Sequence, residues 1–160
     1  MKTNELQITV IIPVRNMATK IEKCLKGVFG QSLKPYEIIV VDGHSTDDTV
    51  EKASKFPVKI LYEDYHNRAG ACQVGVENAK GEYIAFTDGD CIPNRLWLAN
   101  LVKELKVKSV AGVGGRYEDI SDHLWSHSIN LTFNTPLSGA KSRWSDKRNY
   151  SIRRISITNN

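Results

Sequence analysis

Two aspartates, Asp88 and Asp90, flank Gly89 directly after the apolar stretch at residues 83–87. Mg²⁺ and Mn²⁺ bind oxygen ligands, and proteins often hold them with one or two carboxylates while substrate phosphates and water complete the shell. Gly89 leaves room between the acids for a phosphate or a substrate backbone to approach closely. Because aspartate and glycine are also ordinary turn residues, the motif alone is compatible with both a metal site and a solvated turn.

A third carboxylate, Asp42, follows another apolar stretch at residues 37–41. It could accept a hydrogen bond from a nucleobase N–H, or it could serve as a cap or turn residue ahead of a helix. Residues 45–48 have a capping-box pattern, which predicts a helix that opens at Ser45 and runs to about residue 55. The pattern accounts for Ser45 and Asp48 better than for Asp42, so both roles of Asp42 stay open.

Small side chains follow Arg68, since residues 69–71 are Ala-Gly-Ala. At the start of a helix they leave room for a diphosphate, whose charge Arg68 would balance. Arg68 and Gly70 are therefore candidate phosphate-binding residues. Close packing of a helix on a sheet, with a surface arginine, explains the same residues equally well.

Strands and helices alternate along the chain in the predicted secondary structure. Strands are expected at residues 8–12, where Pro13 ends the run, and at 37–41, 58–62, 83–87 and 109–113. Helices are expected at 17–29, 45–55, about 69–79 and from 93 to about 105. This alternation requires crossover connections and a mostly parallel central sheet flanked by helices, so the predicted fold class is α/β. Ligands of such sheets bind beyond the carboxyl ends of the strands, where residues 13–16, 42–45 and 88–90 lie.

The composition describes one soluble globular domain, with 41% hydrophobic and 25% charged residues in a chain of 160. The net charge of +4 is uneven, because residues 1–140 carry 16 basic and 17 acidic residues while 141–160 carry 6 and 1. A nucleic-acid-binding protein usually carries its basic face on the folded body, so we expect no nucleic acid partner. The three cysteines form no CxxC pair, which argues against a disulfide scaffold.

No apolar run approaches the roughly 18 residues that a membrane-spanning helix needs, and the first seven residues are polar. We therefore expect a cytoplasmic protein. The basic stretch at residues 141–154 could also contact anionic lipid head groups, which allows a peripheral location at the inner face of the membrane.

Several nucleotide-binding motifs are absent from the sequence. It contains neither GxGxxG after the first strand nor GxxxxGK[ST], which argues against dinucleotide-binding and P-loop proteins. A phosphoacceptor receiver domain with Asp42 as acceptor would need acidic residues after the first strand, where this chain has Pro-Val-Arg-Asn. Such a domain remains a weaker alternative.

Four segments together resemble the family 2 glycosyltransferases, which have the Rossmann-like GT-A fold of nucleotide-diphospho-sugar transferases. They match over residues 8 to about 115 in the family's order and spacing, and they are VIIPVRN at 10–16, IVVDGHSTDDT at 39–49, the Ala-x-x-x-Gly stretch at 71–75 and GEYIAFTDGDCIP at 81–93.

The resemblance implies roles for particular residues. Pro13, Arg15, Asn16 and Asp42 would line the pocket for the base and ribose, Asp88 would contact the ribose or the metal, and Asp90 would bind Mg²⁺ or Mn²⁺ directly. The implied donor is a nucleotide-diphosphate sugar, most commonly a UDP-sugar, and the implied acceptor is a glycan or lipid-linked hydroxyl. Transfer would be metal-assisted and would invert the anomeric centre, with a carboxylate base activating the acceptor.

The sequence departs from the family pattern at three places. It has Asp42-Gly43 where the family often has two acids, and Cys72-Gln73 where the family often has Arg-Asn. Residues 149–154 resemble the segment that enters the acceptor site, but no acidic residue follows Asp146 to supply the expected base. No catalytic base is identified.

We therefore expect a nucleotide-sugar-binding domain at residues 1–115 and an incomplete acceptor-side region at 116–160. The alternative is a catalytically incomplete domain that binds nucleotide-sugar and metal and needs further C-terminal residues or a partner.

Overall fold

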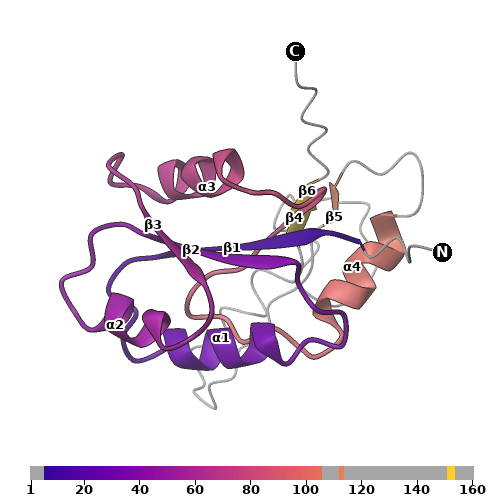
Figure 1. Cartoon of the computed structure of the whole chain (residues 1–160), viewed down its shortest axis with the longest axis horizontal. Helices are drawn as coiled ribbons and strands as arrows, with labels where there is room; N and C mark the ends of the chain where they lie inside the picture. Colours follow the sequence, from indigo (N-terminus) through magenta and orange to yellow (C-terminus); the bar gives the residue numbers. More distant parts are fainter. Residues whose placement is uncertain (1–5, 106–111, 114–150, 154–160) are drawn as a thin grey trace, which may run out of the picture. The chain divides into compact units, whose positions relative to one another are not determined.

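The central sheet has six strands in the order β3-β2-β1-β4-β6-β5 (Figure 1). The computed structural model describes residues 6–105, 112–113 and 151–153. The strands are β1 Ile8–Val14, β2 Glu37–Asp42, β3 Lys59–Tyr62, β4 Tyr83–Phe86, β5 Gly112–Val113 and β6 Ser151–Arg153. The first four are parallel, and β6 runs antiparallel to both β4 and β5. The predicted mostly parallel α/β sheet is confirmed.

Helices cover both faces of this sheet. They are α1 Ile21–Phe29, α2 Thr49–Ser54, α3 Arg68–Glu77 and α4 Trp97–Leu105. In Figure 1, α3 lies on one face, and α1 and α2 lie on the other. Successive residues of β1 point to opposite faces, so Val10 packs in the cluster that contains Leu25 of α1, whereas Ile11 packs in the one that contains Ala71 of α3. Burial on both faces explains why β1 is an unbroken apolar run.

The strand β1 continues through Pro13 to Val14, so the prediction that Pro13 ends it is wrong. Thr87 N–H donates to Ile11 O on the β4 side, and Gly43 N–H donates to Val14 O on the β2 side. Because backbone groups alternate between sides, the Pro13 nitrogen faces the β4 side, where β4 has already ended at Phe86. Its missing N–H therefore breaks no hydrogen bond of the sheet.

The predicted capping box at residues 45–48 is also wrong. Helix α2 begins only at Thr49, and its N-cap residue Asp48 makes no side-chain capping bond. The Ser45 hydroxyl instead donates to Asp42 and accepts from Asn16 N–H. The segment before Thr49 is therefore a loop that Ser45 ties to its neighbours.

Helix α1 starts later than the apolar periodicity predicts, at Ile21 rather than residue 17. Met17 O accepts the N–H groups of both Lys20 and Ile21, each at 2.9 Å, which closes a turn before the helix. The apolar positions Ile21, Leu25 and Val28 are buried as predicted.

The strand β6 was not predicted. It adds to the edge of β4, pairing Ala85 with Ile152, and it also pairs with β5. Of the strand expected at residues 109–113, only 112–113 fall among the described residues.

By its contacts the chain divides into one compact unit of residues 1–113 with 150–160 and a second unit of 114–149. The expected assignment of 1–115 to donor binding and 116–160 to the acceptor side stays a prediction. Within the described ranges, no helix is both long enough and apolar enough to cross a membrane.

Candidate functional site

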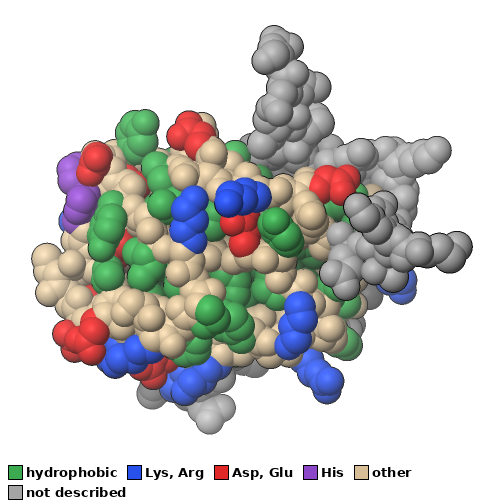
Figure 2. Space-filling model, in the orientation of Figure 1, with side chains coloured by type: hydrophobic (Ala, Val, Ile, Leu, Met, Phe, Trp, Pro, Cys, Tyr) green, Lys and Arg blue, Asp and Glu red, His purple; other side chains and the backbone are tan. Residues whose placement is uncertain are grey.

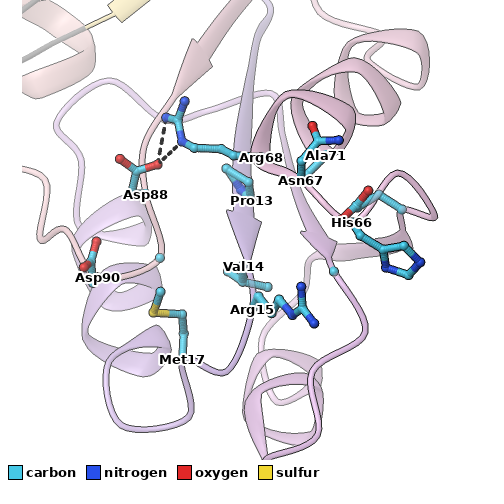
Figure 3. Close-up of a pocket in the computed structure, with 13 residues that line it drawn as sticks. Pro13, Val14, Arg15, Met17, His66, Asn67, Arg68, Ala71, Asp88 and Asp90 are labelled. Carbon is cyan, nitrogen blue, oxygen red and sulfur yellow. Dashed lines mark hydrogen bonds and ion pairs between the residues drawn. The ribbon is translucent and has the colours of Figure 1, made fainter.

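A cleft of about 430 Å³ opens at the carboxyl ends of the parallel strands (Figure 3). This volume lies in the range of small-molecule sites. Its lining comes from the end of β1, from the segments that follow β1 to β4 and from the start of α3. It comprises Pro13, Val14, Arg15, Met17, Gly43, Glu63, His66, Asn67, Arg68, Ala71, Asp88, Gly89 and Asp90. The structure thus brings together six of the predicted site residues, namely Pro13, Arg15, Arg68, Asp88, Gly89 and Asp90.

Arg68, the first residue of α3, reaches across the cleft to Asp88, which follows β4 (Figure 3). Its Nε and Nη2 lie 2.8 and 2.7 Å from the same oxygen, Asp88 Oδ1. The side chain of Asp88 is 30% exposed and that of Arg68 is 62% exposed. The pair therefore sits at the cleft surface, where an incoming anion could compete for the guanidinium.

Gly89 holds the turn that carries both aspartates close against β1. A Cβ at Gly89 would lie 2.7 Å from Val14 Cγ1, so Val14 or the turn would have to move to admit a side chain at this position. The turn is closed by Cys91 N–H, which donates to Asp88 O at 3.0 Å. Close packing of backbone on β1 is thus what places the two carboxylates at the cleft.

Asp90 is the more open of the two acids, with its side chain 42% exposed. Its Oδ2 lies 3.5 Å from Lys20 Nζ. Among the described residues, no group of three or more His, Cys, Asp or Glu side chains converges as a metal cage. Two carboxylates on one turn fit a hard divalent cation that takes its remaining ligands from phosphate and water.

Three thiols surround this turn. Burial, followed by the nearby carboxylates of Asp90 and Asp88, raises the pKa of Cys91 to about 11. Burial also raises the pKa of Cys24 to about 12 and raises that of Cys72. Neutral thiols are poor ligands for a hard cation, so the oxygen atoms of the turn are the better candidates.

The loops after β1 and β2 are tied together by side chains. Asn16, with φ of 53°, accepts from Thr46 N–H through Oδ1 at 2.9 Å, and its own N–H donates to Ser45 Oγ at 2.8 Å. Asp47 accepts from Ala18 N–H at 3.0 Å and from the hydroxyl of Thr49, and the Thr49 bond is the main reason that its pKa is lowered. Asn16 therefore lies in this loop contact and outside the cleft lining.

Asp42 lies beneath these loops and is 1% exposed. Its Oδ2 accepts from Ser45 N–H at 2.9 Å and its Oδ1 accepts from the Ser45 hydroxyl at 2.5 Å. It does not line the cleft. In the structure its carboxylate fixes the turn at Ser45.

Gly70 also lies outside the cleft lining, because Tyr65 packs over it. A Cβ there would lie 2.4 Å from Tyr65 Cβ. Further along α3, a Cβ at Gly75 would lie 2.5 Å from Ile11 Cγ2. The small residues of α3 thus allow close packing on both sides, while the cleft receives the helix start itself, where Asn67 caps Gly70 N–H at 2.9 Å.

Sequence reasoning missed Glu63, which lines the cleft yet is only 2% exposed. It directly follows β3, as Asp42 ends β2 and Asp88 follows β4, so the rule of strand carboxyl ends could have found it. The same holds for His66 and Asn67, which lie in the same loop between β3 and α3. The loop after β2 meets β3 and the loop that follows it. The ring centroid of His44 lies 5.9 Å from that of Tyr62, on which it stacks, and 6.0 Å from that of His66.

On the face shown in Figure 2, basic and acidic side chains of the described residues are interspersed. Purple histidine side chains lie together at one edge of this face, next to an acidic side chain. In the loops after β2 and β3, His44 Nε2 lies 2.7 Å from Asp64 Oδ1.

The sequence matches the model of the family described as "Glycosyl transferase family 2" over residues 9–159. It is 40% identical over 119 residues to glycosyltransferase AglE of Haloferax volcanii, a match that covers 69% of this chain and 39% of that protein. It is 31% identical over 158 residues to a dolichyl N-acetyl-alpha-D-glucosaminyl phosphate 3-beta-D-2,3-diacetamido-2,3-dideoxy-beta-D-glucuronosyltransferase of Methanococcus voltae, covering 89% of this chain and 49% of the relative. The chain thus spans less than half the length of either relative.

Solved structures share the fold. The mannosyltransferase PcManGT of Pyrobaculum calidifontis, in complex with GDP-Man and Mn²⁺, superposes with a TM-score of 0.69 at 24% identity and covers 95% of this chain and 45% of its own. Glucosyl-3-phosphoglycerate synthase of Mycobacterium tuberculosis, in complex with Mn²⁺, UDP and glucosyl-3-phosphoglycerate, superposes with a TM-score of 0.67 at 19% identity. The match covers 92% of this chain and 57% of the synthase. With the family match over nearly the whole sequence, these likenesses show that the chain belongs to the family 2 glycosyltransferases and has their GT-A fold.

Proposed function

We propose that the cleft binds a nucleotide-diphosphate sugar together with Mg²⁺ or Mn²⁺, as the donor site of an inverting glycosyltransferase. The observation that carries the proposal is the Arg68 guanidinium facing Asp88, with Asp90 on the same turn. A cation-binding acid pair and an arginine at a helix start are the groups that a diphosphate needs on its two sides. The proteins of known structure with this fold include complexes with GDP-Man, UDP-GlcNAc and UDP, which supports a nucleotide donor.

The strand order gives the cleft two ends. Asp88 follows β4 and Glu63 follows β3, and three strand spacings separate these strands. At about 4.8 Å per spacing the span is about 14 Å, enough for an extended nucleoside diphosphate. We therefore assign the diphosphate and metal to the Asp88, Asp90 and Arg68 end, and the nucleoside to the end formed by Pro13, Arg15 and Gly43.

In the proposed reaction the cation, held by Asp90 and Asp88, would neutralise charge on the departing diphosphate. The Arg68 guanidinium would exchange its contact with Asp88 for one with a phosphate oxygen. Arg15 would supply a second positive charge along the cleft. Asp42 and Asn16 would act by fixing the loops that carry Pro13 and Arg15. The acceptor, a glycan or lipid-linked hydroxyl, would attack the anomeric carbon from the opposite side and lose its proton to a base outside this set of residues.

Calorimetry of the chain with UDP, GDP and dTDP tests the donor site. We expect binding that requires Mn²⁺ or Mg²⁺, that EDTA abolishes and that Asp90→Ala weakens by at least about tenfold. Asp64→Ala is the matched control, because Asp64 is an exposed acid outside the cleft lining. Failure of all three nucleotides to bind with either metal would refute the proposed donor site. Transfer or hydrolysis of a donor sugar in the presence of Mn²⁺ would test the reaction itself.

A further inference from the structure

Glu63 is a buried acid, and one of its carboxylate oxygens has no hydrogen-bond partner in the part of the chain that the structure describes. The residue is 2% exposed, and the oxygen is Oε2. Its backbone is fixed, because its N–H donates to Asp42 O at 3.1 Å. A buried carboxylate oxygen that lacks a donor is costly in free energy, and a functional role is one of the reasons that such a group is kept in a native structure. Since Glu63 lines the cleft, a ligand in the cleft could supply the missing donor.

Asp42, the acid that the family resemblance assigns to base recognition, is already engaged. Both of its oxygens accept from Ser45, and it lies outside the cleft lining. At this end of the cleft, Glu63 is the acid that the lining contains. The acceptor for a base N–H is therefore better placed on Glu63, at the end of β3.

Gly43 explains how Glu63 reaches this position. A Cβ at residue 43 would lie 3.1 Å from Glu63 Oε1 and 3.6 Å from Arg15 Cδ. The carboxylate of Glu63 thus occupies the space beside residue 43 that a side chain there would need. This chain has Gly43 where the resemblance leads us to expect a second acid. Glu63, directly after β3, thus supplies a carboxylate that residue 43 does not.

We propose that Glu63 recognises the nucleobase of the donor by accepting a hydrogen bond from a ring N–H on its Watson–Crick edge. The inference rests on the proposed donor site and names the residue that reads the base. Uracil offers N3–H and guanine offers N1–H for this contact. Both are neutral donors that would satisfy a charged acceptor inside a desolvated site.

The test compares UDP and GDP with their analogues methylated at uracil N3 and guanine N1, which lack the donor. With Mn²⁺ present, we expect the matching nucleotide to bind the wild-type chain about tenfold more tightly than its methylated analogue. Glu63→Gln should weaken the parent nucleotide by about tenfold, because a charge-assisted hydrogen bond is replaced by a neutral one. In the Glu63→Gln variant, the methylated analogue should bind almost as tightly as its parent nucleotide. Whichever of UDP and GDP shows this pattern identifies the base.

A stability measurement separates this role from a structural one. Because Glu63→Gln removes an unpartnered buried charge, the melting temperature of the nucleotide-free chain should stay the same or rise. Asp64→Asn, which makes the same change at an adjacent exposed acid, should leave nucleotide affinity unchanged. Equal binding of UDP and GDP by Glu63→Gln and wild type, or equal affinity for parent and methylated nucleotides, would overturn the inference. Absence of nucleotide binding by the wild type would instead refute the donor site as a whole.

Discussion

Arg68 contacts a single carboxylate oxygen of Asp88, since both its Nε and its Nη2 lie within 2.8 Å of Asp88 Oδ1. The two residues come from opposite sides of the cleft, one from the start of α3 and the other from the end of β4. A guanidinium can exchange a carboxylate for a phosphate, because it presents the same paired N–H donors to either group. The resting contact therefore keeps Arg68 extended over the cleft.

Replacing Arg68 tests this arrangement. Arg68→Ala should weaken UDP or GDP binding by about tenfold, and Arg68→Lys should recover part of the loss, because lysine keeps the charge and loses the fork. Affinity for the nucleoside alone should not change. Calorimetry measures each affinity, and equal losses for nucleoside and diphosphate would contradict the assignment. Unfolding stability should change by less than about 1 kcal/mol, since the pair is partly exposed.

Lys20 Nζ lies 3.5 Å from Asp90 Oδ2, where it would compete with the cation of the proposed donor site. Lys20→Met should therefore increase Mn²⁺ affinity by about twofold to fivefold, in line with the weak coupling of exposed ion pairs. Titration of free Mn²⁺ by electron paramagnetic resonance measures the change. Lys55→Met is the control, because Lys55 pairs with Glu51 outside the cleft. A decrease in affinity for Lys20→Met would show that the lysine assists the metal.

The sequence predicted the order of elements because each buried strand and amphipathic helix carries its own local pattern. It failed where contacts distant in sequence decide the outcome. The end of β1 depends on where β4 stops beside Pro13, and the loop before α2 depends on the Asn16 N–H that donates to Ser45 Oγ across 29 residues of sequence. The strand β6 pairs with β4 across more than 60 residues of sequence, and a short segment carries little signal for such a pairing.

The candidate site shows the same division. Asp88 and Asp90 could be proposed from their spacing and their position after a strand. The burial of Asp42 and Glu63 could not be predicted from the sequence, because it results from the packing of loops after three different strands. In the sequence, Gly43 is only a departure from the family pattern. Its proximity to the Glu63 carboxylate depends on the three-dimensional structure.

Gly89 should be intolerant of any side chain. Its Cβ would meet Val14 Cγ1 at 2.7 Å, so Gly89→Ala should lower the free energy of unfolding by about 1–3 kcal/mol and weaken Mn²⁺ binding by moving the acids. Urea denaturation measures the stability. Adding Val14→Ala should restore part of it, because the clash is removed. If the double variant shows only the sum of the single losses, the contact is not the cause.

Ser45 should be important for stability out of proportion to its size. Ser45→Ala removes the hydroxyl that donates to buried Asp42 and accepts from Asn16 N–H, so the free energy of unfolding should fall by about 1–3 kcal/mol. Ser54→Ala is the matched control: its hydroxyl bonds to Glu51 O on the surface, and the change should cost less than about 0.5 kcal/mol. Equal stabilities of the two variants in urea denaturation would refute the role of Ser45.

Cys24 should make the protein less stable at alkaline pH. Burial raises the pKa of its thiol from 9.0 to about 12, so below pH 9 the thiol is neutral in both the folded and the unfolded chain and contributes no pH dependence. Between pH 9 and 12 it loses its proton only in the unfolded chain. Stability therefore falls as pH rises, by up to about 1.4 kcal/mol per pH unit from this group.

The variant Cys24→Ala isolates this contribution, because it removes the thiol while the other alkaline-titrating groups remain. It should be less stable than the wild type at pH 7, since a fully buried side chain is shortened. Between pH 9 and 11 its stability should fall less steeply, and urea denaturation at each pH measures both slopes. Ser54→Ala should keep the wild-type slope. A Cys24→Ala slope as steep as that of the wild type would mean that the thiol ionises equally in both states, which its complete burial argues against.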